Sequence, residues 1–321
     1  MAFFRHTTPV KDETEEIQDK KLPIEAPETV NGVRDFWQHW DYLLDMVTEL
    51  AEFGVPILDA VGLTLNESIQ AESEIGTIQP GETVIEKGTR VTPRMLPLLA
   101  GMGILKVMAR PSPRVLVMAL SDQAVPASYL VTAQAQQVGA AAHRLEYIAE
   151  RGSQLVTSIT EQLVRADLVV TIGGLGESGT DLKEVADQIG PNDFTPVAIS
   201  PGRDHGFILA EEKIPLLAMP ADVYSSFVLA KLIGEPMISK LMGASTDPQM
   251  PSAYLAQPLR IQTDILTCVP ASVKDARMTI TGRPSGLEGM NLIYQANALA
   301  LLQSSDGVVN ADTEAFYLPL S

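Results

Sequence analysis

Cysteine, positive charge and long hydrophobic runs are scarce in this sequence. The 321 residues include one cysteine, Cys268, so no disulfide can form within the chain, and a reducing compartment, the cytoplasm, is the expected location. Lysine and arginine total 23 against 40 aspartate and glutamate residues, which gives a formal net charge of −17. This balance argues against nucleic acids and anionic membrane surfaces as partners, because both bind clustered basic side chains.

No stretch of the sequence approaches the ~18 consecutive apolar residues that a membrane-spanning helix needs, so we expect no membrane insertion. The first residues, MAFFRHTTPVKDETEE, lack the apolar core of a signal peptide. Residues 1–30 are charged and contain prolines, and we expect them to be a flexible tail. Hydrophobic residues make up 45% of the chain, which is typical of a globular protein with two or three domains.

The stretch that organises the chain is 166–183, ADLVVTIGGLGESGTDLK. Its apolar, β-branched residues 168–172 predict a buried strand of a parallel sheet. Two glycines end the strand, and a helical pattern begins near Leu182. A strand, a glycine turn and a helix start can point backbone N–H groups at a ligand, although the pattern is neither G-x-G-x-x-G nor a P-loop. A plain turn capped by Ser, Thr or Asp fits the same residues.

Strand and helix patterns alternate on both sides of this stretch. Strand patterns occupy 114–120, 143–149, 196–199 and 214–219, and helical patterns occupy 129–138, 153–165, 182–189 and 225–241, the last broken near 234–236. The alternation predicts an α/β fold with a doubly wound, mostly parallel sheet. Ligands of such sheets bind beyond the carboxyl ends of the strands. The stretches expected to converge there are 121–123, 173–181, 201–203 and 220–222.

Two smaller regions flank the α/β region. Residues 33–53 predict a helix whose apolar stripe includes Trp37 and Trp40, with His39 off the stripe and in solvent. A polar linker at 244–252 precedes a region of strand patterns. We therefore expect a flexible tail at 1–30, an N-terminal helical and β dimerisation segment at 31–110, an α/β domain at 111–245 and a small C-terminal β domain at 246–321.

Seven segments, in this order, resemble the molybdopterin molybdenumtransferase family, called MoeA in bacteria and the E domain of gephyrin in animals. They are LDAVGLTLNESIQA, PGETVIEKGTRVTPRMLPLLAGMGI, RVLVMALSDQ, GGLGESGTDLKEV, SPGRD, MPADVYSSF and GMNLIYQANALALL. The resemblance spans about residues 40–321. It implies that the α/β domain is MoaB/Mog-like, that the protein dimerises, and that molybdate is joined to a nucleotide-activated molybdopterin with the help of a divalent metal.

The chain departs from the family pattern in several places. The family's inserted second domain is absent, because only 70–76, QAESEIG, bridges its place. Asp122 alone remains of the carboxylates in the family's Ser-Thr-Gly-Asp-Glu motif. Glu177 and Asp204 add negative charge where a phosphate would bind, and a like charge at ~4 Å costs about 4 kcal/mol at an effective dielectric near 20. Ala221 replaces a glycine at a position expected to need a positive φ.

The resemblance assigns site residues by position. If the chain is an active enzyme, the catalytic positions are Asp122, Asp181, Lys183 and Arg203. The positions that bind the molybdopterin cofactor are Gly173, Gly174, Ser178, Pro201, Gly202, Arg203, Pro220 and Ser225. Asp122 is also the candidate metal ligand.

Some of these residues have simpler explanations. Asp181 fits a helix cap, Lys183 a surface residue, and Asp122 an Asx turn at the end of a strand. His143 and His205 have no neighbours at metal-ligand spacing, and we predict that both are structural.

The departures favour a degenerate molybdenum-cofactor site in a non-catalytic, gephyrin-like homodimeric scaffold. Its partner would be a peptide tail of a cytoskeletal, cell-division or receptor protein, bound near 33–66 and 290–321, around Phe316 and Tyr317. No tightly bound cofactor is expected. The alternative is a working molybdopterin molybdenumtransferase that uses Mg²⁺, molybdate and adenylated molybdopterin. A third possibility is one half of a hetero-oligomer with an intact paralogue, whose surface would complement this acidic chain.

Overall fold

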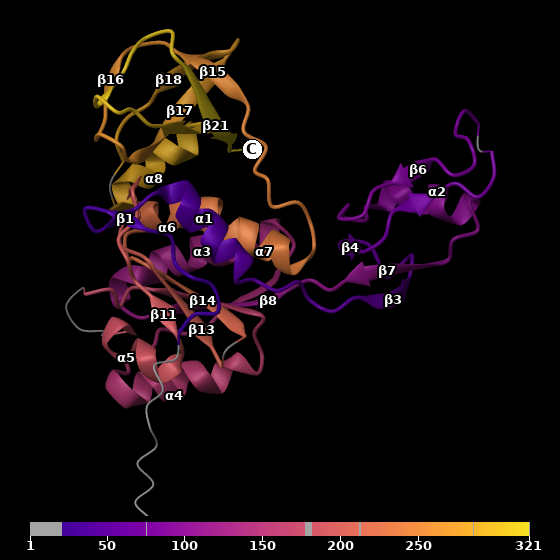
Figure 1. Cartoon of the computed structure of the whole chain (residues 1–321), viewed down its shortest axis with the longest axis horizontal. Helices are drawn as coiled ribbons and strands as arrows, with labels where there is room; N and C mark the ends of the chain where they lie inside the picture. The colour runs from indigo at the N-terminus through magenta and orange to yellow at the C-terminus, as the bar shows by residue number, and fades with distance from the viewer. Residues whose placement is uncertain (1–20, 75, 177–181, 212, 285, 321) are drawn as a thin grey trace, which may run out of the picture.

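The computed structural model describes residues 21–320 apart from 75, 177–181, 212 and 285. Figure 1 shows an α/β domain, a β domain stacked on it, and a small unit that projects to one side. None of the helices in the described ranges is long and apolar enough to cross a membrane.

The α/β domain is built on a mostly parallel sheet. Within the described residues this sheet has six strands in the order β11-β13-β14-β10-β8-β9. β9, β8, β10 and β14 run parallel, and β13 is antiparallel to β14 and β11. The strands are β8 (Arg114–Ala119), β9 (Ala141–Arg144), β10 (Leu168–Ile172), β11 (Asn192–Asp193), β13 (Gly206–Ala210) and β14 (Ile214–Met219).

Helices cover both faces of this sheet, as the alternating pattern predicted. Val115 and Val117 of β8 contribute to one apolar core, and Leu116 and Met118 contribute to the other. The first core includes residues of α1 (Phe36–Asp45), α3 (Val125–Gln137), α6 (Val223–Leu229) and α7 (Glu235–Leu241). The second includes residues of α4 (Gly152–Leu163) and α5 (Leu182–Ile189).

The helix expected to break near 234–236 does not break. α6 continues into α7 through a π-helical turn, η3 (Ala230–Gly234). The wider turn accommodates Pro236 at the second position of α7, where a proline has no N–H to donate to the preceding turn.

Helix α1 packs on the α/β domain and not on the residues that follow it. Asp35 caps the helix by accepting hydrogen bonds from the backbone N–H groups of Trp37 and Gln38. Trp40 donates from Nε1 to the carbonyl of Leu232 over 2.6 Å. The predicted segment 31–110 is therefore in two parts, and its role in dimerisation stays a prediction.

The second part of that segment is the projecting unit, residues 53–110, which has its own apolar core around Val55, Leu65 and Leu99. Its elements are β3 (Phe53–Pro56), β4 (Thr64–Leu65), β5 (Ile69–Gln70), β6 (Thr83–Ile85), η1 (Pro93–Met95), α2 (Leu96–Gly101) and β7 (Lys106–Arg110). Residues 71–82 alone join β5 to β6, which leaves no place for an inserted domain.

The C-terminal domain is a closed β-barrel. Its strands pair in the circuit β17-β18-β15-β21-β19 and back to β17, around small apolar residues such as Ala271 and Ala300. The barrel strands are β15 (Ser252–Leu255), β17 (Leu266–Lys274), β18 (Arg277–Ile280), β19 (Ala298–Leu302) and β21 (Glu314–Pro319), with α8 (Gly286–Gln295) between β18 and β19. The remaining short strands are β1 (Thr29–Val30), β2 (Val33–Arg34), β12 (Ile199–Ser200), β16 (Leu259–Arg260) and β20 (Val308–Val309).

The strand expected at 196–199 therefore does not extend the α/β sheet. β12 pairs in parallel with β17 of the barrel, so the chain reaches the second domain before it returns to form β13. The sole cysteine, Cys268, is buried in β17, and burial raises the pKa of its thiol.

Replacing Gly190 by alanine is expected to lower the free energy of unfolding by about 1–3 kcal/mol. A Cβ atom there would lie 2.3 Å from the carbonyl oxygen of Leu209, and backbone cannot move aside as a side-chain tip can. Gly101→Ala at the end of α2 is the control, because no atom of the residues that the structure describes lies within 4 Å of its added Cβ. Equal urea midpoints for the two variants would contradict the packing described here.

Candidate functional site

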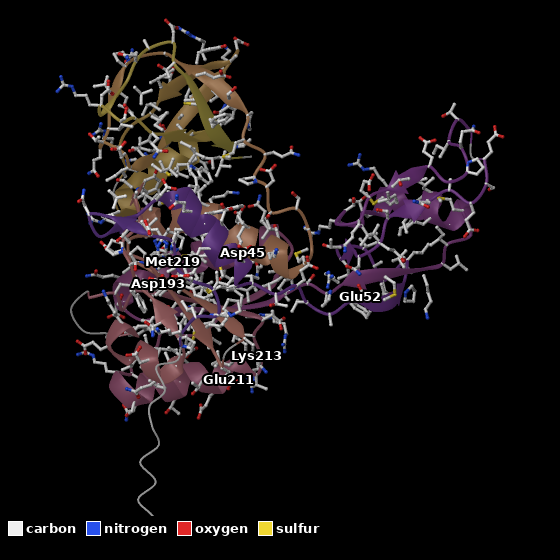
Figure 2. The ribbon with its side chains drawn as sticks, viewed as in Figure 1. Asp45, Glu52, Asp193, Glu211, Lys213 and Met219 are labelled. Atoms are coloured by element: carbon white, nitrogen blue, oxygen red, sulfur yellow. The ribbon has the colours of Figure 1, made fainter. Side chains whose placement is uncertain are left out.

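The carboxyl ends of the parallel strands meet at one edge of the sheet. The backbone N–H of Leu120 donates to the carbonyl of Ile172 over 2.9 Å, and the backbone N–H of Gly173 donates to the carbonyl of Met219 over 2.8 Å. Figure 2 shows Met219 and Asp193 at the edge that faces α1 and the barrel, with Glu211 and Lys213 toward the opposite edge. The predicted convergence of strand ends is thus present, and we call the surface of 121–123, 173–176, 201–203 and 220–222 the strand-end cradle.

The glycine turn after β10 fits closely against the turn after β8. Gly173 and Gly174 have φ angles of +90° and +80°, which residues other than glycine rarely adopt. A Cβ at Gly173 would lie 3.1 Å from Oγ of Ser121. The hydroxyls of Ser121 and Thr171 are buried and have no hydrogen-bond partner in the part of the chain that the structure describes. Buried hydroxyls normally have a partner, so this turn has unused capacity to bind a polar ligand.

Residues 201–203 reach the same edge from β12. Because β13 is antiparallel to β14, with Gly206 opposite Ala218, the residues before Gly206 lie beside the end of β14. Gly202 has a φ of +99°, and a Cβ there would lie 2.9 Å from Leu229. Arg203 is exposed, as is Asp204. A guanidinium group is therefore available at the cradle, beside a carboxylate.

The turn after β14 has a structural task. One carboxylate oxygen of Asp222 accepts from both the N–H and the hydroxyl of Ser225, each over 2.7 Å, and caps α6. The other accepts from the N–H of Gly286 at the start of α8 over 2.9 Å. Asp222 thus joins the two domains, and Ser225 holds its carboxylate in place. Ala221 has no positive φ, so the backbone strain expected at this position is absent.

The other predicted site residues are dispersed. Asp122 is exposed at the start of η2 (Asp122–Ala124). Lys183 is exposed on α5, with Nζ 5.9 Å from the centre of the Phe194 ring. Ser178 and Asp181 lie outside the described residues, as does Glu177. Among the residues that are described, no three His, Cys, Asp or Glu side chains converge to hold a metal.

Sequence patterns did not predict a buried network of polar side chains beside the cradle, which joins Arg34, Asp193, His39 and His205. Arg34 donates from Nη1 to Oδ2 of Asp193 over 2.7 Å and to Nδ1 of His39 over 3.1 Å. Nε2 of His39 lies 3.0 Å from Nε2 of His205, whose Nδ1 donates to the carbonyl of Gly202 over 2.7 Å. The prediction that His39 is in solvent was wrong, because its side chain is 3% exposed.

Both histidines of this buried network, His39 and His205, are held neutral. Burial lowers the pKa of His39, and the nearby His205 and Arg34 lower it further. Burial also lowers the pKa of His205, and the bond to the Gly202 carbonyl only partly opposes this. Asp193 would have a raised pKa from burial alone, but hydrogen bonds from Thr195 and Arg34 hold it below its usual value. The buried network therefore contains one ion pair, Arg34 with Asp193, and two neutral imidazole rings at pH 7.

An apolar pocket of about 300 Å³ lies where α1 meets the barrel. Its walls include Trp37, Leu266, Leu301 and Phe316. Phe316 is 56% exposed, so an aromatic surface borders the pocket. The neighbouring Tyr317 instead packs against the barrel core. Trp37, Leu301 and Phe316 belong to the two ranges from which a peptide site was predicted, and Leu266 lies outside them.

The comparisons with known proteins point to one family, although no family model matches the chain. The chain is 25% identical over 251 residues to molybdopterin molybdenumtransferase 1 of Mycobacterium tuberculosis, covering 74% of this chain and 55% of that protein. It is 26% identical over 192 residues to the molybdopterin molybdenumtransferase of Haemophilus influenzae, covering 56% of this chain and 47% of that one. The chain spans about half the length of these curated relatives.

A solved structure shows the same fold. The molybdenum cofactor biosynthesis protein from Pyrococcus furiosus superposes with a TM-score of 0.71 at 20% identity, over 89% of this chain and 98% of that one. The names of the curated matches agree with the family that the seven ordered motifs resemble, and the chain runs from β5 to β6 without an inserted domain. The chain is therefore similar in sequence and in fold to proteins of the molybdopterin molybdenumtransferase (MoeA) family.

Proposed function

We propose that the chain acts in molybdenum cofactor biosynthesis and binds a nucleotide-activated molybdopterin at the strand-end cradle. The observation that carries the proposal is the buried Ser121 hydroxyl, which lies against Gly173 without a partner among the described residues. A buried hydroxyl left unpaired costs roughly 1–3 kcal/mol, and an anionic ligand oxygen would remove that cost. The names of the relatives support this function over the scaffold that the sequence departures favoured.

The positive charge of Arg203 favours binding of an anion at that side of the cradle. The guanidinium of Arg203 is exposed and can approach a phosphate, and a charge pair at ~4 Å is worth about 4 kcal/mol at an effective dielectric near 20. Asp204 beside it opposes part of that attraction. We therefore expect affinity in the micromolar range and not tighter, with Ser121 and Arg203 as the main polar contacts.

The transfer of molybdate is the further part of the proposal. The family's chemistry uses a divalent metal, and the described residues do not fit one, because Asp222 is occupied in capping α6 and no acidic cluster converges. No step is assigned to a metal here. Arg203 would hold the pterin phosphate at the cradle, whereas Asp122 and Lys183, which lie apart on η2 and α5, have no role in holding molybdate.

Calorimetric titration with nucleotide-activated molybdopterin tests the proposal. Binding with a Kd near ~1 μM, about −8 kcal/mol, supports it. Adding molybdate to the complex then separates the two parts, because release of the nucleotide shows transfer and its retention shows a binding protein. A titration without heat at protein concentrations far above that Kd would refute pterin binding.

A second candidate, the protein-binding scaffold, is favoured by the apolar pocket between Trp37 and Phe316. Selection from a random peptide library tests it. A motif that binds the wild type and the Tyr294→Asp variant but not Phe316→Asp would support it, since Tyr294 is an exposed aromatic residue that does not line this pocket. A homodimer and a cytoplasmic location complete the proposal, and a stable homodimer in sedimentation would count against an obligatory heteromer with a paralogue.

A further inference from the structure

In the buried network beside the cradle, the hydrogen bonds that lead from Arg34 to the Gly202 carbonyl all donate in one direction. An arginine can only donate hydrogen bonds and a carbonyl oxygen can only accept them. Since Arg34 donates to Nδ1 of His39, that ring must carry its proton on Nε2. His39 then donates to Nε2 of His205, which leaves the His205 proton on Nδ1, where it is donated to Gly202. Each ring nitrogen has a partner, so the tautomers follow from the network.

This buried network connects separate parts of the fold to one loop of the cradle, residues 201–203. Asp193 lies on β11, Arg34 on β2, His39 on α1, and His205 just before β13. The Gly202 carbonyl that receives the last hydrogen bond immediately precedes Arg203. The same loop is held a second time, because the backbone N–H of Val197 donates to the carbonyl of Arg203 over 3.1 Å.

We propose that His205 is a positioning residue, which His39 holds in the tautomer that binds the Gly202 carbonyl, so that the loop presents Arg203 to the substrate anion. The inference rests on the proposed function, because it takes Arg203 to face a ligand at the cradle. His205 itself is buried and does not reach the ligand. Its effect is to keep the loop in one conformation before binding, which reduces the entropy lost when the ligand binds.

The network also predicts what happens to its hydrogen bonds when a histidine takes up a second proton at low pH. A proton added to Nε2 of His205 would face the N–H of His39, and moving the latter to Nδ1 would face Arg34. The charged and titratable groups around the pair are Arg34, Tyr42, Asp193 and Asp204. The two carboxylates favour the extra proton and Arg34 opposes it. The hydrogen bond between His39 and His205 is therefore kept only while both rings are neutral, whereas the Nδ1–H of His205 can donate to the Gly202 carbonyl in either state.

Two matched substitutions separate positioning from mere packing. His205→Asn places its amide nitrogen near the Nδ1 position, so it keeps the donation to Gly202 and loses the contact with His39. His205→Gln places its amide near the Nε2 position, so it keeps the contact with His39 and loses the donation to Gly202. Each variant loses one buried hydrogen bond, and their stabilities are expected to be similar.

The first measurement needs no ligand: hydrogen exchange of the Val197 amide in the full chain. We expect at least about tenfold faster exchange in His205→Gln than in His205→Asn, which corresponds to about 1.4 kcal/mol. The second is calorimetric titration with nucleotide-activated molybdopterin, where His205→Gln should bind at least about tenfold more weakly and His205→Asn should stay within about threefold of the wild type.

Equal exchange in the two variants would overturn the proposal, and so would unequal exchange with equal affinity. If the wild type does not bind the pterin at all, the proposed function fails and the link to Arg203 fails with it. The exchange comparison then still decides whether His205 fixes the loop, so the two failures are distinguishable.

Discussion

Replacing Asp193 by alanine is expected to lower the free energy of unfolding by about 3–5 kcal/mol, because it leaves a buried guanidinium without its counter-charge. The side chains of Arg34 and Asp193 are 3% and 9% exposed, and their ion pair is 2.7 Å long. Arg34 would retain its contact with His39, which carries no compensating charge. A loss of this size is a large part of the ~5–15 kcal/mol that stabilises a typical domain.

Urea unfolding of the variant and two controls measures this effect. The ion pair of Arg277 with Asp312 is exposed on both sides, so Asp312→Ala should cost less than about 1 kcal/mol. The double variant Arg34→Met with Asp193→Leu should recover much of the loss, because it removes both charges from the interior. A cost for Asp193→Ala as small as that for Asp312→Ala would show that the buried pair is not needed.

The second large effect is a loss of stability in mild acid. His39 and His205 have lowered pKa values in the folded protein, so the unfolded chain takes up protons first as the pH falls below about 6.5. Their contribution is present above that pH and is lost as the pH falls toward the folded-state values. The slope is at most about 1.4 kcal/mol per pH unit for each histidine, or about 2.7 for both.

Urea midpoints measured from pH 7.5 to 5.0 test this prediction. This range lies above the ordinary pKa of most carboxyl groups, so the histidines dominate it. The variant His39→Gln removes one of the two titrating groups and should reduce the slope by about half, although it is less stable at pH 7.5. A wild-type midpoint that does not change between pH 6.5 and 5.0 would mean that the rings are already charged in the fold.

The sequence was a good guide where a pattern is local. Alternating strands and helices predicted an α/β fold with a mostly parallel sheet and an edge formed by residues 121–123, 173–181, 201–203 and 220–222, of which 177–181 lie outside the described residues. It was a poor guide where partners are distant. His39 and His205 are 166 residues apart and Arg34 and Asp193 are 159 apart, and no spacing within the chain reports such pairs.

The barrel and the turn after β14 show the same limit. Apolar residues at 196–199 predict a strand but not that β12 pairs with β17 of the next domain. Likewise, Ala221 stands where the family pattern has a glycine, and the resemblance alone therefore suggested a damaged site. The structure shows that Asp222 caps α6 and accepts a hydrogen bond from the start of α8, so this turn joins the two domains.

The most direct test of a ligand at the strand-end cradle compares Gly173→Ala with Gly176→Ala in a calorimetric titration with nucleotide-activated molybdopterin. Both glycines have positive φ, +90° and +97°, so both variants carry similar backbone strain. Only the methyl group at 173 would meet Ser121, because none of the described residues has an atom within 4 Å of a Cβ at 176. We predict micromolar binding by the wild type and Gly176→Ala, and at least about tenfold weaker binding by Gly173→Ala. Equal affinity in the two variants would place the ligand elsewhere and contradict the account.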